Sequence, residues 1–404
     1  MDEIIPSWLD KHFVTACITG DPSQDRSNCT VSSFDVSSVL PPGNNYAANL
    51  LRVKVTYNNR GKTCTQFMIV KSLIENNLLS KIFYRFFETE PVFYNTYLPE
   101  ALKVNRNLPV PKPFFSPIPD VIVMEDLSEM GYKLPDRCQM LDFEHCKLFV
   151  TASAIFSAVS VAIHKKHPEI VASLAIDPFY SKDLADNCAE LHKTLMTKGL
   201  LCMAEHIAET EQFKKYSKVV RDCAYTTWDK VIELHKPSNK LNVLQQSDAW
   251  TGNVMFKYDN YGKVKDIKIL DFQALRYSSP ASSLIFFLWT SANHEVRERH
   301  LEDLYEIYCD VLNENLAKLK CPERVSLDEF LDDMQLLSPA VLAIAAYFFP
   351  PLTNPCVMDF ERRIALAQSD GENPYEESYG ENYCKDSFLR ILSQLERCGV
   401  FNNL

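Results

Sequence analysis

The sequence has no excess of positive charge. Its 404 residues carry 42 Lys and Arg against 53 Asp and Glu, which gives a formal net charge of −11. Nucleic acids and anionic membranes attract basic surfaces, so we expect neither as a partner. The composition is otherwise that of an ordinary globular protein, with 46% apolar and 24% charged residues.

The sequence also lacks metal-binding cysteine motifs. Its 13 cysteines are scattered, with no Cys-x-x-Cys pair and no Cys/His cluster at the spacing of zinc sites. This pattern is typical of reduced thiols in the cytosol, each acting as a small buried hydrophobe. The first residues, MDEIIPSWLDKHFV, include acids early and do not resemble a signal peptide. We therefore expect a cytoplasmic protein.

No apolar run is long enough to predict a membrane-spanning helix. Residues Leu148–Ile163 fall about one turn short of a span and include Thr and several Ser. Residues Leu336–Phe349 are shorter and are followed by Pro350-Pro351, which should end the helix. Both runs are predicted to be buried core helices.

The chain is longer than one hydrophobic core accommodates, so two lobes are expected. The first lobe should open with a short helix around Trp8–Cys17. Three strands follow, predicted at Val31–Leu40, Leu50–Tyr57 and Thr63–Lys71, with a hairpin turn at Asn58–Gly61. A curled antiparallel sheet of this kind can cover the phosphates of a nucleotide.

A lysine and a glutamate follow this sheet in an order that suits phosphate binding. Lys71 ends a strand, and Glu90 lies in a helix predicted over Asn77–Tyr97. Such a pair can hold the lysine ammonium against the α- and β-phosphates of a nucleotide. Two unrelated surface charges would be the ordinary interpretation of either residue alone. Pro91 should kink or restart the helix.

The boundary between the lobes is predicted from a short apolar strand. Val121–Met124 runs directly into the polar stretch Glu125-Asp126-Leu127, where backbone N–H and C=O groups could meet an adenine ring. We place the first lobe at residues 1–127 and the second at residues 128–404. The second lobe should be mainly helical, beginning with a long helix from the cap residue Asp142 to His164. Further helices are predicted over 181–195, 200–207, 212–235, 284–291, 297–319, 327–337, 341–349 and 385–398.

A hairpin in the second lobe gathers the residues that could carry chemistry. Val254–Tyr258 alternates as a strand, a glycine turn ends at Gly262, and a second strand leads to Asp271. An antiparallel hairpin places Asn253 and Asp271 at one mouth, with Asp248 on the loop leading in. Two oxygen ligands beside a further carboxylate suit a hydrated Mg²⁺ bound to phosphate. A turn or cap role is commoner for any one of the three, but their spacing favours phosphoryl transfer.

Taken in order, these features resemble the ecdysteroid-kinase-like proteins of insects, which are related to choline kinases and aminoglycoside phosphotransferases. The resemblance covers nearly the whole chain, and it implies a protein-kinase-like, bilobal α+β fold with a small antiparallel-sheet lobe and a larger helical lobe. It rests on Gly43-Asn44-Asn45-Tyr46-Ala47, Val70-Lys71, Glu90 with Phe93-Tyr94, Leu98-Pro99, Met124–Ser128, Leu141–Lys147, Asp248-x-Trp250-x-x-Asn253, Asp271-Phe272-Gln273, Arg276-Tyr277 and Ser279-Pro280.

The resemblance implies ATP-dependent phosphorylation of a hydroxyl group on a small molecule. Asp248 would orient the hydroxyl and accept its proton, while Asn253 and Asp271 would hold Mg²⁺. The ATP-binding residues would be Lys71, Glu90, Gly43, Asn44, Asn45, Glu125, Asp126 and Leu127. The best-known acceptors in the family are ecdysteroids, so a sterol hydroxyl is the first acceptor to consider.

Three positions depart from the family pattern. Gln246-Ser247-Asp248 stands where the family has His-Gly-Asp, Ser283 replaces an Asp, and Ser157 replaces a His in the long helix. These changes affect how the loop bearing Asp248 is held, and remove no phosphate or metal ligand. They leave two hypotheses: an active small-molecule kinase, which we prefer, and a pseudokinase that binds nucleotide or a small ligand with little transfer. A scaffold without a ligand ranks last, because it explains neither the Lys71–Glu90 pair nor the hairpin.

Overall fold

The chain divides into two compact units. A computed structural model describes residues 5–20, 29–39, 48–73, 84–175, 186–353, 360–369, 373–380 and 387–404. Unit 1 comprises Met1–Pro99 and Val110–Lys133, and unit 2 comprises Glu100–Pro109 and Leu134–Leu404. The lobe boundary expected after residue 127 stays a prediction.

Unit 1 is built on an antiparallel sheet, as predicted. The strand order is β1-β2-β3-β5-β4, with β1 at Cys29–Ser38, β2 at Ala48–Asn59, β3 at Lys62–Leu73, β4 at Pro113–Phe114 and β5 at Ile122–Glu125. The β2–β3 hairpin turns at Arg60 and Gly61, whose φ angles are 51° and 84°. Two successive positive φ values match the twist of paired strands. The Asn58 side chain accepts a hydrogen bond from the Gly61 N–H and closes the turn.

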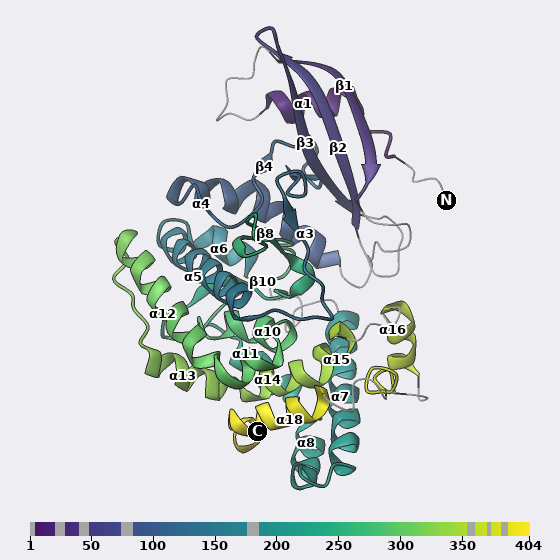
Figure 1. Cartoon of the computed structure of the whole chain (residues 1–404), viewed down its shortest axis with the longest axis vertical. Helices are drawn as coiled ribbons and strands as arrows, with labels where there is room; N and C mark the ends of the chain where they lie inside the picture. The colour runs from purple at the N-terminus through teal and green to yellow at the C-terminus, as the bar shows by residue number, and fades with distance from the viewer. Residues whose placement is uncertain are drawn as a thin grey trace. The chain divides into compact units, whose positions relative to one another are not determined.

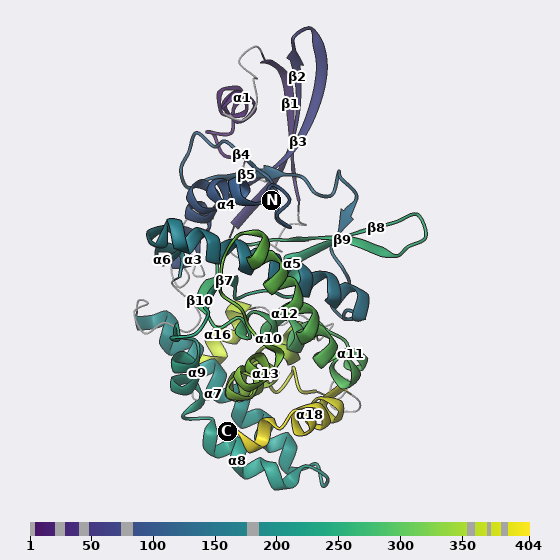
Figure 2. The same ribbon diagram turned by 90° about the vertical axis from the view of Figure 1, so that its left-hand side faces the viewer.

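The core of unit 1 lies between this sheet and one short helix. Helix α1 (Lys11–Thr19) begins at Asp10, whose carboxylate caps the Phe13 N–H at 2.8 Å. Its buried residues Phe13, Val14, Cys17 and Ile18 join apolar side chains of β1, β2, β3 and the segment before β5. Figure 2 shows α1 to one side of these strands. The predicted first helix and the three predicted strands are confirmed.

The helix that carries Glu90 does not stop at Pro91. Helix α3 (Tyr84–Val92) passes through Pro91 into a π-helical segment, η1 (Phe93–Tyr97), and then into α4 (Leu98–Val104). Of the kink or restart expected at Pro91, the restart does not occur, and the helix changes to π-helical geometry two residues later. Because proline supplies no N–H, the following turn can widen without losing a further bond, and the Leu98 N–H bonds to Phe93 O. The predicted residues 77–83 lie outside the described part.

Unit 2 is mainly helical, which confirms the expected α+β class. Its longest helix, α5 (Phe143–Lys166), begins at Asp142, which caps the His145 N–H. It packs against α12 (Leu301–Lys318), as Figures 1 and 2 both show. The other helices are α6 (Pro168–Leu174), α7 (Asp186–Ala208), α8 (Ser217–Cys223), α9 (Thr227–Leu234), α10 (Ser282–Thr290), α11 (His294–Arg299), α13 (Leu327–Leu336), α14 (Ser338–Ala343), α15 (Phe349–Thr353), α16 (Phe360–Gln368) and α18 (Ser387–Arg397).

Helix α5 extends beyond its apolar run, to within two residues of the end predicted at His164. Polar residues at both ends extend it to 24 residues, so by length and composition it could cross a membrane. However, 78% of its most apolar window is buried inside the protein. Helix α13 and the following helical segment Ser338–Thr353 are long and apolar enough to cross a membrane only if they are counted as one span. The two segments are bent by 57° relative to each other. The burial of α5 is that of the core helix that was expected.

Several predicted helix boundaries differ from the structure. Two helices predicted over 181–195 and 200–207 form one helix, α7, where residues are described. The helix predicted over 212–235 is instead a 3₁₀ turn (Lys214–Tyr216), α8 and α9. The break follows from Cys223, whose carbonyl accepts bonds from the hydroxyls of Thr226 and Thr227. The helix predicted over 297–319 is divided at His300 into α11 and α12.

The hairpin of unit 2 forms as predicted. Strands β8 (Val254–Tyr258) and β9 (Val264–Ile269) pair antiparallel, and Gly262 has φ 78° in the turn. A second pair of strands, β7 (Val243–Gln246) and β10 (Leu275–Ser278), was not predicted. It pairs Gln246 with Leu275, and so fixes the residues on both sides of the Asp248 loop and the Asp271 loop.

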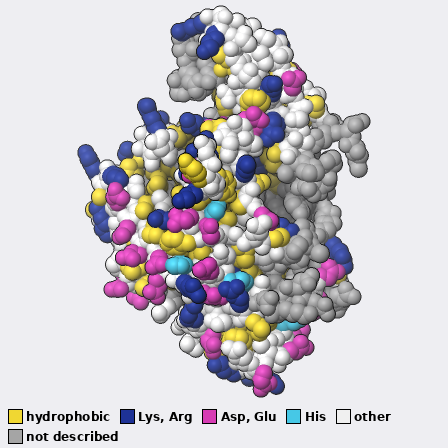
Figure 3. Space-filling model, in the orientation of Figure 1, with side chains coloured by type: hydrophobic (Ala, Val, Ile, Leu, Met, Phe, Trp, Pro, Cys, Tyr) yellow, Lys and Arg dark blue, Asp and Glu magenta, His cyan; other side chains and the backbone are white. Residues whose placement is uncertain are grey.

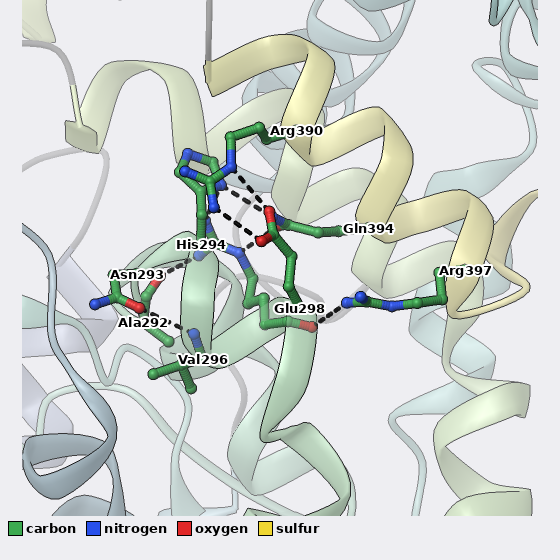
Figure 4. A network of polar contacts seen from close by, with 9 residues as sticks. Ala292, Asn293, His294, Val296, Glu298, Arg390, Gln394 and Arg397 are labelled. Carbon is green, nitrogen blue, oxygen red and sulfur yellow. Dashed lines mark hydrogen bonds and ion pairs between the residues drawn. The ribbon is translucent and has the colours of Figure 1, made fainter.

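The C-terminal helix α18 is held to α11 by a polar network (Figure 4). Arg390 donates two bonds to the Glu298 carboxylate, each 2.8 Å. Gln394, which is fully buried, donates to Glu298 Oε1 and accepts from Arg297 Nε. Figure 3 shows acidic side chains interspersed with Lys and Arg over the described part of one face.

Candidate active site

Unit 1 brings Lys71 and Glu90 together. Lys71 lies on β3, opposite Ile122 of β5, and Glu90 lies on α3. Lys71 Nζ is 2.5 Å from Glu90 Oε2, and the two side chains are 12% and 4% exposed. A buried ion pair of this kind fixes the position of the ammonium, because removing either partner would leave a charge without compensation. The expected pairing of these two residues is present.

The residues at the end of β5 are held by contacts within unit 1. The Asp126 carboxylate binds the Arg52 guanidinium and accepts the Ser128 N–H at 3.0 Å. This contact with Asp126 raises the pKa of Arg52 above its usual value. Glu125 Oε1 accepts the Lys112 N–H at 3.1 Å. Both carboxylates therefore stabilise the backbone conformation of this stretch. An adenine bound here would have to be recognised by main-chain groups.

Main-chain groups of the same stretch are partly engaged. The Glu125 N–H donates to Lys112 O, and Leu127 O accepts bonds from the N–H groups of Met130 and Tyr132. Adenine recognition at Glu125, Asp126 and Leu127 stays a prediction. The predicted phosphate-covering residues Gly43, Asn44 and Asn45 lie outside the described residues.

Unit 2 brings Asp248 and Asn253 into contact. Asn253 is the last residue of the 3₁₀ turn Thr251–Asn253. Its side-chain Nδ2 donates to the Asp248 carbonyl at 2.9 Å and to Asp248 Oδ2 at 3.2 Å. The Asn253 carbonyl accepts the Leu270 N–H at 2.8 Å, so Asp271 comes next to Asn253 at the mouth of the hairpin. The three residues expected to gather at this mouth do so.

Asp271 is held in an unusual backbone conformation. Its φ is 61°, in the left-handed region that residues other than glycine rarely adopt. Gln246 Nε2 donates to the carbonyls of Leu270 and Asp271, both at 2.9 Å. Phe272, the residue after Asp271, is fully buried and packs against Phe156. Gln246 therefore fastens the loop that carries Asp271, a role that the sequence did not reveal because main-chain acceptors leave no pattern in it.

The donor atoms at this mouth fit a hard cation. Because Asn253 Nδ2 faces Asp248, its Oδ1 is the atom left for a metal ion. Together with the Asp271 carboxylate it would give an all-oxygen donor set, which Mg²⁺ prefers over nitrogen or sulfur ligands. The residues present therefore fit Mg²⁺.

The other two family departures meet at one tyrosine. Tyr308 of α12 shares a hydrogen bond of 2.9 Å with Ser157 of α5, and Ser283 of α10 also bonds its hydroxyl. Burial raises the pKa of Tyr308 to about 12. The Ser283 hydroxyl also donates to Pro280 O at 2.7 Å. Three neutral hydroxyls therefore occupy this buried position.

The hydroxyl of Ser247, next to Asp248, has no comparable contact among the described residues. Ser247 Oγ and Gln246 Oε1 are both buried, and neither has a hydrogen-bond partner within the described part of the chain. The Ser247 N–H bonds to Ala274 O at 2.9 Å, so its backbone is held although its hydroxyl is not. The loop path therefore tolerates Ser in place of Gly.

Comparison with known proteins gives one family and several solved structures to which the chain is similar. The chain matches the sequence model of the ecdysteroid kinase-like family over residues 42–321. No curated protein matches the sequence.

Three solved structures are similar to this one. An ethanolamine kinase from Plasmodium vivax has 11% identity and a TM-score of 0.42, covering 92% of this chain and 84% of its own. A choline/ethanolamine kinase family protein from Mesorhizobium loti has 12% identity and a TM-score of 0.34, covering 95% and 98%. A GDP and kanamycin complex of APH(2")-IIia has 12% identity and a TM-score of 0.38, covering 83% and 90%.

The family match extends over more than half of the chain and includes every described candidate residue, from Lys71 to Asp271. The expected resemblance to this family is confirmed. The chain belongs to the ecdysteroid kinase-like family.

Proposed function

We propose that this protein is an ATP-dependent kinase that phosphorylates a hydroxyl group on a small, apolar acceptor. The observation that carries the proposal is the contact of Asp248 with Asn253 beside the Asp271 loop. It joins a carboxylate that can accept a proton to an oxygen donor set that fits Mg²⁺. The buried Lys71–Glu90 pair supplies a positioned ammonium for phosphate. Family membership supports the reaction class, and the reduced, cytoplasmic setting is part of the proposal.

The reaction needs these groups to position atoms and to balance charge. The acceptor oxygen bonds to the γ-phosphorus, the bond from that phosphorus to the bridging oxygen breaks, and ADP leaves. Asp248 orients the hydroxyl and accepts its proton. Asn253 and Asp271 would hold Mg²⁺, which when bound would neutralise phosphate charge. Lys71 binds the phosphates, and the predicted residues Gly43, Asn44 and Asn45 cover them.

An ecdysteroid-like sterol is the first acceptor we propose. Family membership is its support, and plant or xenobiotic alcohols are alternatives within the same chemistry. The panel for the assay therefore holds ecdysteroids, simple apolar alcohols, ethanolamine and an aminoglycoside. The last two represent the ligands named for the similar structures.

The test is phosphate transfer from Mg-ATP with the full chain. We expect at least one acceptor to be phosphorylated, and Asp248→Asn to lower kcat by about 10²–10⁴-fold, the usual contribution of a general base. Asp259→Asn is the matched control, because Asp259 lies in the exposed turn of the same hairpin and caps the N–H groups of Tyr261 and Lys263. Equal activity in wild type and Asp248→Asn would refute the assigned role of Asp248.

The second candidate is a pseudokinase. The observation that favours it is the buried Ser247 hydroxyl, which has no hydrogen-bond partner among the described residues. A catalytic loop supported by fewer contacts loses preorganisation before it loses ligand binding. Binding of Mg-ATP with no turnover on any acceptor would favour this alternative. Absence of nucleotide binding would exclude both functions.

A further inference from the structure

Outside the candidate active site, unit 2 places a cysteine, a histidine and a glutamate close together. Cys202 and His206 lie four residues apart on α7, which puts them on one face of the helix. Glu376 comes from the turn segment 373–380, which follows α16 in the chain. The potential ligand atoms of the three residues all lie within 4.8 Å of one another. Figure 1 shows α16 alongside α7.

We propose that Cys202, His206 and Glu376 bind a zinc ion. Zinc bonds of about 2.3 Å to sulfur and 2.0–2.2 Å to nitrogen and oxygen place the ligand atoms of a tetrahedral site about 3.3–3.6 Å apart. Cys202 Sγ and Glu376 Oε1 are already 3.8 Å apart. Small movements of side chains therefore complete the geometry. On binding, the thiol loses its proton to solvent and the thiolate bonds to the metal.

The donor types select zinc over the cation of the kinase site. Mg²⁺ and Ca²⁺ take oxygen ligands, whereas thiolate and imidazole suit Zn²⁺. Three protein ligands leave the fourth tetrahedral position for water, because Glu376 lies on the exposed side of the cluster. Cys202 is fully buried and closes the opposite side.

Neighbouring contacts hold the three ligands in place. The His206 ring stacks on Tyr379, with ring centroids 5.1 Å apart and planes inclined by 9°. Tyr379 is buried, and its hydroxyl donates to Ala346 O. At the start of the segment, Asn373 Nδ2 donates to Lys198 O of α7 at 2.9 Å. The segment is thus fastened to α7 on both sides of Glu376, which is the support that a metal site requires.

The next acidic residue has a different partner. Glu377 Oε1 is 2.6 Å from Arg362 of α16. Glu376 and Glu377 are both exposed and adjacent, yet only Glu376 belongs to the cluster. This pair supplies a matched control.

The experiment measures metal binding to the full chain without a histidine tag. Purified protein is stripped of loosely bound metal and titrated with Zn²⁺ against a colorimetric chelator, then with Co²⁺. We expect one tightly bound zinc per chain and a thiolate-to-cobalt charge-transfer band. Glu376→Gln should weaken zinc binding by at least about tenfold, since even loss of an outer hydrogen-bond partner costs 10–100-fold. Glu377→Gln should bind as wild type does.

A second pair of variants tests the thiol. Cys202→Ser should abolish the cobalt band, and Cys223→Ser, another buried cysteine, should leave it unchanged. If Cys202→Ser does not fold, the exposed Glu376→Gln variant still decides the matter. No zinc binding, no cobalt band, or equal affinity in Glu376→Gln and Glu377→Gln would overturn the proposal. None of these outcomes depends on phosphate transfer.

Discussion

Gln246 shows at the scale of one residue how a single amide side chain can hold a loop through its backbone. Its Nε2 reaches two consecutive carbonyls, those of Leu270 and Asp271. An amide has two N–H donors, so one side chain can satisfy both acceptors. The residue acts on the metal loop through the backbone, and is therefore a positioning residue.

We expect Gln246→Ala to loosen this loop. The two carbonyls would lose their donor in a buried position, which costs about 1–3 kcal/mol of unfolding free energy. Under the proposed function, kcat should fall and the Mg²⁺ concentration for half-maximal activity should rise. Urea unfolding and Mg²⁺ titrations measure the two effects.

The neighbouring amide provides the control for that experiment. Gln245 is also buried on β7, but its Nε2 donates to the hydroxyl of Ser278 and contacts that of Ser282. Gln245→Ala should cost stability without changing the Mg²⁺ dependence. If both variants shift the Mg²⁺ dependence alike, Gln246 has no special connection to Asp271.

The residues of the candidate site could be predicted from the sequence because their side chains carry the oxygen ligands themselves, and these residues occur at a recognisable spacing. The spacing of Asp248, Asn253 and Asp271 around a hairpin determines where they meet. The role of Gln246 could not be predicted, since its acceptors are main-chain carbonyls. The same holds for Ser157, Ser283 and Tyr308, which come from three separate helices.

At the scale of elements, the wrong predictions are those where packing outweighs local preference. Gly199 falls between the helices predicted over 181–195 and 200–207, but it lies within α7. A Cβ at this position would lie 3.1 Å from Ala346 O, so glycine permits close contact with the π-helical segment Ile344–Phe348. Pro350-Pro351, expected to end a helix, lie inside α15, directly after that widened segment. Local propensity contains no information about either contact.

Two kinds of contact hold α18 to α11: a buried amide and a more exposed ion pair. Arg390 and Glu298 are 47% and 29% exposed, and such pairs contribute about 0.2–1 kcal/mol. Gln394 is fully buried and accepts from Arg297, which is 1% exposed. We expect Gln394→Ala to lower the unfolding free energy by about 1–3 kcal/mol, and Arg390→Ala by no more than about 1 kcal/mol.

Urea unfolding of both variants measures this difference. The bidentate geometry of Arg390 makes it the more prominent contact in Figure 4. A larger loss for Arg390→Ala than for Gln394→Ala would show that the ion pair, and not the buried amide, fastens the helix.

At the scale of the whole molecule, acid should act first on unit 2. Burial lowers the pKa of His192 to about 4, and burial with the nearby Arg297 and Arg390 lowers the pKa of His294 to about 3. Below about pH 6.5 these histidines bind protons in the unfolded chain but stay neutral in the folded protein. The unfolding free energy therefore decreases as the pH falls. The Arg390 contact lowers the pKa of Glu298 to about 2, which adds a loss below about pH 4.5.

We expect the unfolding free energy of unit 2 to decrease between pH 7.5 and pH 5. Each of these histidines contributes up to about 1.4 kcal/mol per pH unit between its folded and unfolded pKa values. Urea unfolding at the two pH values measures the slope, and His192→Gln should reduce it. His12→Gln, at an exposed position on α1, should not. An unchanged slope in His192→Gln would show that this ring is not the group that resists protonation.

The two hydrogen bonds from Gln246 also have a kinetic consequence. An amide has no proton that leaves or arrives in the neutral range, whereas a histidine in the same place would change charge there. The fastening of the Asp271 loop is therefore constant across that range. A rate profile measured against proton concentration would then report the ionisation of Asp248 and of the substrates, free of any contribution from the group that secures the loop.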